Sequence, residues 1–266
     1  MRGMITDILR PATARDAVRA KSAPGAAFLG GGTWLNSGRA ADTTILISLE
    51  KLGLDRIEAS GDGCALGAAV TLQQMIDSPS VPSALKAAAA LTASRTLRNM
   101  QTLGGELGLC PDDSAIIPVL VVMGAVLRLA SRRRLLPLED FLNRRPGDLI
   151  LSVTLPDTRR PCAVKALSRT SHSPRSLVAA ACLTETDRRL REIRVVISDC
   201  AGQRSRMLET SSGGTELPSR ERLEALVARV FSPKPDLHAS VAYKRYMAGV
   251  LVADAVRGLG SGGATQ

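Results

Sequence analysis

The order in which the predicted helices and strands follow one another limits the fold of this chain more than any other sequence feature. The pattern predicts helices at residues 13–20, 72–76, 82–93, 114–123, 217–231 and 240–256. It predicts strands at residues 26–29, 44–49, 64–70, 125–130, 149–155, 162–168, 177–184 and 190–198. Strands and helices do not alternate regularly, as they do in a doubly wound parallel sheet, so the chain is predicted to be α+β in both halves.

The composition is typical of a globular protein with an aliphatic core, and it argues against several functional classes. Hydrophobic residues make up 45% of the 266 residues but aromatic residues only 2%, so single-strand nucleic-acid binding by base stacking is not expected. The net charge of +10 comes from arginines scattered among acids, which also argues against a nucleic-acid partner. Two histidines and five widely spaced cysteines without a CxxC pair exclude the usual metal sites. One of the histidines, His172, is expected in a solvated loop.

The chain predicts neither a secretory signal nor a membrane span. Its longest apolar stretch, residues 115–127, is too short to cross a bilayer and contains Pro118. We therefore expect a cytoplasmic protein with no membrane partner.

A stretch rich in proline and polar residues, 158–161, is the best domain boundary in the sequence. It predicts a domain of two α+β subdomains at residues 1–157. A smaller domain, a three-stranded antiparallel sheet plus helices, is predicted at residues 158–258. The Gly/Ser/Ala-rich residues 259–266 are predicted to form a disordered tail.

Three consecutive glycines, Gly30–Gly32, follow the predicted strand at residues 26–29. Because glycine has no Cβ, the backbone can turn sharply there and direct successive N–H groups into one concavity that suits phosphate oxygens. Thr33 adds a hydroxyl donor. The segment matches neither the dinucleotide fingerprint nor a P-loop, and a plain turn is the alternative interpretation. Trp34 either packs against its neighbours or stacks on a cofactor.

A second segment has similar chemistry. Thr102 is followed by Gly104 and Gly105, and Arg98 lies just before them. Two such loops could hold a pyrophosphate from both sides, with Arg98 offsetting its charge. The two loops together suggest a bound dinucleotide without establishing one.

Taken in order, these motifs resemble the flavin-binding medium subunit of the molybdenum hydroxylases, the xanthine dehydrogenase family. The segment FLGGGTWL at residues 28–35 is similar to the family's AGGTDL loop, and LRNMQTLGG at residues 97–105 is similar to its IRNxATLGGN loop. The segment SVAYKRY at residues 240–246 is similar to the family's SAEYRR helix. The resemblance runs from end to end, and the chain looks like a divergent bacterial, xanthine-dehydrogenase-like FAD-binding subunit.

The resemblance implies a PCMH-type FAD-binding domain of two subdomains that hold an extended FAD between them. It implies an oxidoreductase subunit in a hetero-oligomer with an iron–sulfur subunit and a molybdopterin subunit. Electrons would pass from the clusters through FAD to NAD or another acceptor, and the subunit alone would not hydroxylate a substrate. No catalytic or metal-binding residue is predicted in this chain, because the redox chemistry belongs to the cofactor. The implied FAD contacts are Phe28, Leu29, Gly30, Gly31, Gly32, Thr33, Trp34, Leu35, Arg98, Thr102, Gly104, Gly105 and Glu106.

Three positions depart from the family pattern. Glu106 stands where the family has Asn, Trp34 where many relatives carry an acid, and Ala115 where the family has Asp. A buried carboxylate near a pyrophosphate is unfavourable unless a cation neutralises it. The alternative interpretation is therefore a flavin-free scaffold or interaction subunit that keeps the fold and has lost FAD.

Overall fold

The structure is a computed structural model, and it describes residues 4–37, 42–144, 146–170, 173–187, 190–199, 203–212, 217–236 and 239–260. His172 and residues 261–266 lie outside these described residues, whereas residues 259 and 260 of the predicted tail belong to the last helix. The chain divides into two compact units. The first comprises Met1–Ser80, Ala93–Leu109 and Ala125–Pro156, and the second comprises Val81–Thr92, Cys110–Gly124 and Asp157–Gln266.

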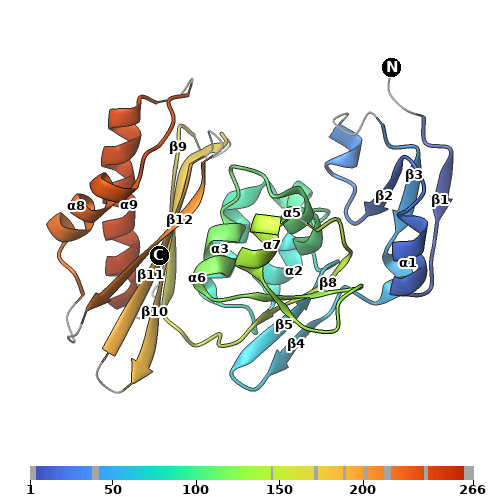
Figure 1. Cartoon of the computed structure of the whole chain (residues 1–266), viewed down its shortest axis with the longest axis horizontal. Coiled ribbons are helices and arrows are strands. Elements are labelled where there is room, and N and C mark those ends of the chain that lie inside the picture. The colour runs from blue at the N-terminus through green and yellow to red at the C-terminus, as the bar shows by residue number, and fades with distance from the viewer. Residues whose placement is uncertain are drawn as a thin grey trace. The chain divides into compact units, whose positions relative to one another are not determined.

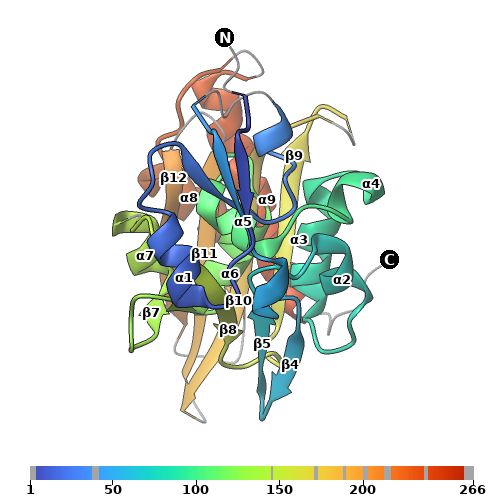
Figure 2. The same cartoon turned by 90° about the vertical axis from the view of Figure 1, so that its right-hand side faces the viewer.

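The first unit begins with a small parallel sheet of β1 (Asp7–Leu9), β3 (Ile45–Ser48) and β2 (Ala26–Leu29), in that order. Helix α1 (Ala14–Ala20) lies alongside this sheet in both views (Figures 1 and 2). The helix begins where predicted, because the Thr13 side chain accepts a hydrogen bond from the Asp16 N–H. Its buried Ala17 packs in one cluster with Ala26 and Ile47.

The second part of the first unit is an antiparallel sheet with the strand order β4-β5-β8-β6-β7. The strands are β4 (Ile57–Ser60), β5 (Gly63–Gly67), β6 (Val126–Leu129), β7 (Leu136–Pro137) and β8 (Ile150–Leu155). The associated helices are α2 (Leu72–Asp77), α4 (Arg95–Arg98), α5 (Leu103–Leu109) and α7 (Leu138–Arg144). Thr71 and Gln74 form a reciprocal capping box at the start of α2, so this helix begins at the predicted residue.

The second unit is built on an antiparallel sheet with the strand order β12-β11-β10-β9. The predicted strands are present as β9 (Cys162–Ser168), β10 (Arg175–Asp187) and β11 (Leu190–Asp199), and β12 (Gln203–Ser212) adds a fourth that the sequence analysis did not predict. Helices α8 (Arg220–Val230) and α9 (Val241–Gly260) cover one face of the sheet through an aliphatic core (Figure 1). Helices α3 (Ser83–Thr92) and α6 (Ile116–Val122) also pack on its strands.

The two units differ from the contiguous halves that the sequence suggested, because α3 and α6 belong to the second unit. Arg175 fixes this arrangement within the unit. Its guanidinium donates to the carbonyl oxygens of Leu91 and Thr92 at the end of α3 and forms an ion pair with Asp113 just before α6. The predicted division into domains at residue 157 stays a prediction, although Asp157 is where the chain enters the second unit for the last time.

An ion-pair cluster around a fully buried lysine lies inside the second unit. The Lys244 Nζ on α9 lies 2.7 Å from a carboxylate oxygen of Asp199 and 2.7 Å from one of Asp236, and it donates to the Lys234 carbonyl. Neither the Lys244 nor the Asp199 side chain is exposed to solvent. The cluster therefore joins the end of β11, the segment before α9 and α9 itself.

The observed elements confirm the α+β fold class. Among the helices that the structure describes, none is both long and apolar enough to span a bilayer.

Candidate functional site

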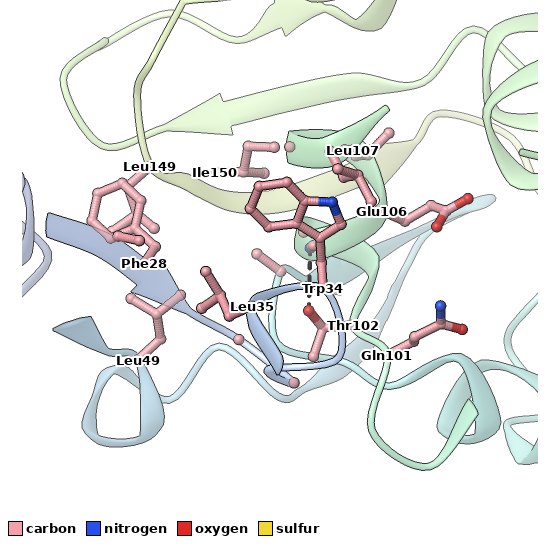
Figure 3. Close-up of a pocket in the computed structure, with 18 of the residues that line it drawn as sticks. Phe28, Trp34, Leu35, Leu49, Gln101, Thr102, Glu106, Leu107, Leu149 and Ile150 are labelled. Carbon is pink, nitrogen blue, oxygen red and sulfur yellow. Dashed lines mark hydrogen bonds between the residues drawn. The ribbon is translucent and has the colours of Figure 1, made fainter. Parts of the chain in front are cut away.

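A pocket of ≈ 550 Å³ lies within the first unit and is lined by both of its sheets and by α5. This volume lies in the range of known ligand and cofactor pockets. One end is apolar: Phe28, Leu49 and Leu149 gather on one side of Trp34 (Figure 3). The Gln101 and Glu106 side chains lie on the other side of the indole (Figure 3). The pocket thus has an apolar wall and a polar end, and the glycine-rich turn after β2 runs along it.

The glycine turn after β2 lines this pocket with a run of residues whose backbone N–H groups have no protein acceptor among the described residues. Gly32 has a φ of 71°, a left-handed conformation that favours glycine. The turn closes with hydrogen bonds from the Asn36 N–H to the Gly32 carbonyl and from the Ser37 hydroxyl to the Trp34 carbonyl. Within the part of the chain that the structure describes, the N–H groups of residues 30–34 donate no hydrogen bond to a protein acceptor. Successive free amides of this kind form a concavity that binds anions.

The second glycine segment is the first turn of helix α5 and not a loop, which corrects the sequence interpretation. The Leu103 N–H donates to the Val70 carbonyl, and the Gly104 N–H donates to the Ala68 carbonyl. The Gly105 N–H donates to the Thr102 hydroxyl oxygen, which is the dashed line in Figure 3. Protein acceptors therefore already engage the amides that we expected to face a pyrophosphate from this side.

The two glycine segments nevertheless meet, as the dinucleotide interpretation requires. A Cβ added to Gly30 would lie 2.7 Å from the Thr102 hydroxyl, and one added to Gly31 would lie 1.5 Å from the Met100 carbonyl oxygen. Only glycine fits at position 31, because no real Cβ comes so close to a backbone oxygen. Thr33 and Thr102 line the same pocket.

The charged groups around the pocket differ from those that the sequence suggested. The predicted cation, Arg98, does not line the pocket: its guanidinium donates to the Gln73 side chain at 3.2 Å and to the Ala93 carbonyl at 2.7 Å. Lys21, at the end of α1, does line the pocket. Glu106 is only 6% exposed, and its carboxylate points away from the Trp34 indole (Figure 3).

Trp34 lies across the pocket with one part of its ring open to solvent. The side chain is 38% exposed, and the indole stands between the apolar and polar ends of the pocket (Figure 3). Of the two interpretations left open by the sequence, this position favours an exposed ring that can contact a ligand over a ring packed in a core. An exposed indole in a cofactor-sized pocket offers a surface for stacking.

Most of the predicted contact residues line this pocket, and Leu29 and Arg98 do not. The Leu29 carbonyl instead accepts a hydrogen bond from the Leu49 N–H, next to the β2–β3 ladder. The sequence analysis missed further lining residues: Lys21, Leu49, Gln101, Leu107, Phe141, Leu149 and Ile150. Gln101 and Leu107 lie within or beside the second glycine motif, whereas no local motif marks the other five, which come from distant segments.

Comparison with known proteins assigns the chain to a family. Residues 4–158 match the family model described as the FAD binding domain in molybdopterin dehydrogenase. The chain belongs to this family. FAD is the cofactor by which the family is defined, so the cofactor prediction is confirmed at this level.

The chain is also similar to individual proteins over most of its length. It is 32% identical over 254 residues to the uncharacterized protein YgfM of Escherichia coli K12, covering 94% of this chain and 95% of YgfM. It is 26% identical over 223 residues to the nicotine 6-hydroxylase medium subunit of Paenarthrobacter nicotinovorans, covering 77% and 78% of the two chains.

One solved structure shows how far the fold is shared. The carbon monoxide dehydrogenase of Hydrogenophaga pseudoflava, which lacks the Mo-pyranopterin moiety, matches with a TM-score of 0.83 at 20% identity. The match covers 99% of this chain and 100% of that chain. The prediction of an oxidoreductase subunit is confirmed at the level of the family.

The residues of the pocket fit an FAD in part. The unengaged amides of residues 30–34 fit a diphosphate, and the apolar end and the exposed indole fit a planar ring system. The buried Glu106 carboxylate opposes the binding of an anion. The fit therefore rests on the turn after β2 and on the apolar wall.

Proposed function

We propose that this chain binds FAD in the pocket of its first unit and carries electrons within a molybdenum hydroxylase complex. The electrons come from the iron–sulfur clusters of one partner subunit and leave to NAD or another acceptor. A molybdopterin subunit of the same complex acts on the substrate. The observation that carries this proposal is the run of unengaged amides at residues 30–34, which lines a cofactor-sized pocket.

The chain's own contribution is to bind and orient the cofactor. The amides of residues 30–34 and the Thr33 hydroxyl donate hydrogen bonds to the diphosphate, while the Lys21 ammonium adds an attractive charge. Phe28, Leu49 and Leu149 exclude water from one end of the pocket. When bound, FAD supplies a redox group that takes up electrons singly or in pairs. No side chain of this chain has to act as a general acid or base.

The proposal includes a cytoplasmic location, because the sequence predicts no secretory signal. It also includes a hetero-oligomer. The medium-subunit name of the Paenarthrobacter relative supports a place in a multisubunit enzyme.

A flavin-free scaffold is the second candidate function, and three observations favour it. Protein acceptors engage the amides at the start of α5, Arg98 is directed to Gln73 and Ala93, and the buried Glu106 lines the pocket. Each of these lowers the expected affinity for a diphosphate. A scaffold would keep the fold and its partners but bind no flavin.

Purification of the full chain separates the two candidates. Under the main proposal the protein is yellow or becomes so with added FAD, and denaturation releases FAD as the identified nucleotide. Gly31→Ala should abolish this binding, because the added Cβ would meet the Met100 carbonyl at 1.5 Å. Gly258→Ala, outside the pocket lining, is the control, since a Cβ there meets only the Ala163 Cβ at 3.3 Å. A well-folded, colourless wild-type protein that ignores added FAD would contradict the main proposal and favour the scaffold.

A second experiment tests the electron acceptor. If the acceptor is NAD, anaerobic addition of NADH should bleach the flavin absorbance of the loaded protein, because the reverse electron transfer uses the same site. Unchanged absorbance with NADH, together with bleaching by dithionite, would exclude NAD and leave another acceptor. Expression with the neighbouring genes of the host should yield a copurified iron–sulfur subunit, and isolation of the chain alone would contradict the complex.

A further inference from the structure

Two cysteines face each other across neighbouring strands of the second unit. Cys162 is the first residue of β9, and Cys182 lies opposite it on β10 in the antiparallel register. The Leu183 N–H donates to the Pro161 carbonyl at 2.9 Å, which makes the adjacent opposed pair the hydrogen-bonded one. Because the two kinds of pair alternate along an antiparallel ladder, Cys162 and Cys182 form a non-hydrogen-bonded pair.

This position suits a disulfide without movement of the backbone. Opposed residues of a non-hydrogen-bonded pair have Cα atoms about 4.5 Å apart and side chains that lie closer than in the other kind of pair. Disulfides span Cα distances of about 4.4–6.8 Å. The register therefore places the two Cα atoms at a separation that a disulfide accepts.

The two thiols also interact with each other. A hydrogen bond with Cys182, together with burial, raises the pKa of the Cys162 thiol. The hydrogen bond with Cys162 lowers the pKa of the Cys182 thiol, and the nearby charges of Arg160 and Arg194 act in the same direction against the effect of burial. Cys162 therefore keeps its proton, whereas Cys182 loses its proton more readily. Reactive thiol pairs show the same difference between their two sulfurs.

The location of the pair gives a small oxidant access to it. β9 is an edge strand of the sheet, and Cys162 is half-buried, whereas Cys182 is fully buried. Among the described cysteines, Cys64 is a buried thiol whose pKa burial raises. Cys64 lies on β5 of the first unit, so it serves as an internal comparison for an ordinary buried thiol.

We propose that Cys162 and Cys182 form a redox-active pair that a hydroperoxide converts into a reversible cross-strand disulfide. The Cys182 sulfur, which loses its proton more readily, attacks hydrogen peroxide. The O–O bond breaks, a sulfenic acid forms on Cys182, and the released hydroxide takes up the thiol proton as one water. The Cys162 sulfur then attacks the sulfenic sulfur of Cys182, and the Cys162 proton leaves with the displaced hydroxide as a second water. The two thiols lose two electrons, and the peroxide gains them. A dithiol reductant reverses the reaction.

The disulfide would fix the edge strand to the interior of its sheet. β9 is bonded on one side only, to β10, so oxidation adds a covalent link at the end of the strand where the chain enters the unit. In a reducing compartment such a bond forms transiently and reports the oxidation state.

The test is to treat the full chain with stoichiometric hydrogen peroxide, block the remaining thiols by alkylation, and map the peptides by mass spectrometry. We expect a Cys162–Cys182 cross-link in the oxidised wild-type protein and its loss after addition of dithiothreitol. Amide hydrogen exchange in β9 should slow on oxidation and recover on reduction. The conservative variants Cys162→Ser and Cys182→Ala should form no intramolecular cross-link, and Cys64→Ser is the matched control that still forms it.

Two results would overturn the proposal. One is a wild-type protein in which Cys162 and Cys182 remain alkylatable while another cysteine is oxidised. The other is a cross-link between these two residues that appears only after denaturation. The cross-link is detected by mass spectrometry of peptides from the second unit. Neither result therefore depends on whether the first unit binds FAD.

Discussion

Trp34 is the only tryptophan of the chain, and its partly exposed indole lies in the pocket. We predict that FAD quenches the intrinsic fluorescence of the protein, because a planar ring bound there contacts the indole. Trp34→Leu should weaken FAD binding by about 1 kcal/mol, or roughly fivefold, through the loss of stacking. Fluorescence titration measures the first effect and calorimetry the second.

Free tryptophan titrated with FAD corrects for absorption of the exciting light. Binding of FAD detected by calorimetry with an unchanged, corrected fluorescence would place the flavin away from Trp34.

Glu106 places a buried carboxylate at the polar end of the pocket. Glu106→Gln removes this charge and keeps the shape of the side chain. We expect the affinity for FAD to rise by about 1–2 kcal/mol, a factor of roughly 5–30, because an anionic ligand no longer meets a carboxylate. Glu58→Gln, on the exposed strand β4, is the matched control and should change the affinity little. A lower affinity in Glu106→Gln would mean that the carboxylate holds the ligand.

At the scale of single residues, the sequence predicted the glycine turn well and its charged surroundings poorly. Gly30–Gly32 and Thr33 could be recognised because a strand end with three glycines is a local pattern. Lys21 could not, because it comes to the pocket from the end of a separate helix. Arg98 was named for its place beside the second motif, but its guanidinium binds Gln73 and Ala93.

Helix α5 provides a direct test of why glycine occurs twice at its start. A Cβ on Gly104 would lie 2.8 Å from both the Cβ and the carbonyl oxygen of Ala68. Gly104→Ala should therefore lower the free energy of unfolding by about 1–3 kcal/mol through overpacking. Gly108→Ala, in the same helix with open space around it, should raise it by up to about 1 kcal/mol. Urea denaturation of the two variants measures both values.

Equal effects of the two substitutions would contradict the close packing of α5 on Ala68. A folded Gly104→Ala protein with an unchanged free energy of unfolding would also contradict this close packing.

At the scale of helices and strands, capped and strongly apolar segments were predicted most closely. α1, α2 and α8 begin after Thr13, Thr71 and Ser219, whose side chains cap them. The second glycine motif was interpreted as a loop because paired glycines disfavour a helix. Tertiary contacts override this preference, since buried Leu103 and Leu107 anchor the helix and Gly104 allows its approach to β5 and the residues after it. The short strands β1 and β4 and the ten-residue strand β12 lack a clear apolar alternation in the sequence and were missed.

For the whole molecule, the buried ion pair of the second unit makes stability depend on one lysine. Lys244→Met removes the charge and leaves the buried Asp199 carboxylate without its cation. We expect a loss of about 3–5 kcal/mol in the free energy of unfolding. Lys234→Met, at an exposed side chain in the same unit, is the matched control and should change it little. Equal losses in both variants would contradict the assignment.

The pKa of Lys244 determines how the free energy of unfolding should change at alkaline pH. Burial alone would lower the pKa of Lys244, but the hydrogen bonds and charges of Asp199 and Asp236 raise it overall. A raised pKa in the folded state gives a stabilisation that is complete below the unfolded value of about 10.4 and is lost as the pH rises through the folded value. Above this pH, the free energy of unfolding should fall more steeply for the wild-type protein than for Lys244→Met. Parallel curves of unfolding free energy against pH would contradict the raised pKa of Lys244.

The division of the chain into units shows the limit of reading boundaries from composition. The Pro-rich stretch after residue 157 marked the last entry into the second unit, because such stretches connect elements. The assignment of α3 and α6 to that unit depends on long-range contacts of Arg175 with Leu91, Thr92 and Asp113. No local pattern carries that information.

The central claim is that the backbone amides of the turn after β2 bind the diphosphate of FAD. A crystal structure of the chain grown with FAD tests it most directly. The account predicts diphosphate oxygens within hydrogen-bond distance of the N–H groups of residues 30–34, with the Trp34 indole against a ring of the cofactor. A diphosphate bound elsewhere on the chain, with these amides facing only water, would contradict it.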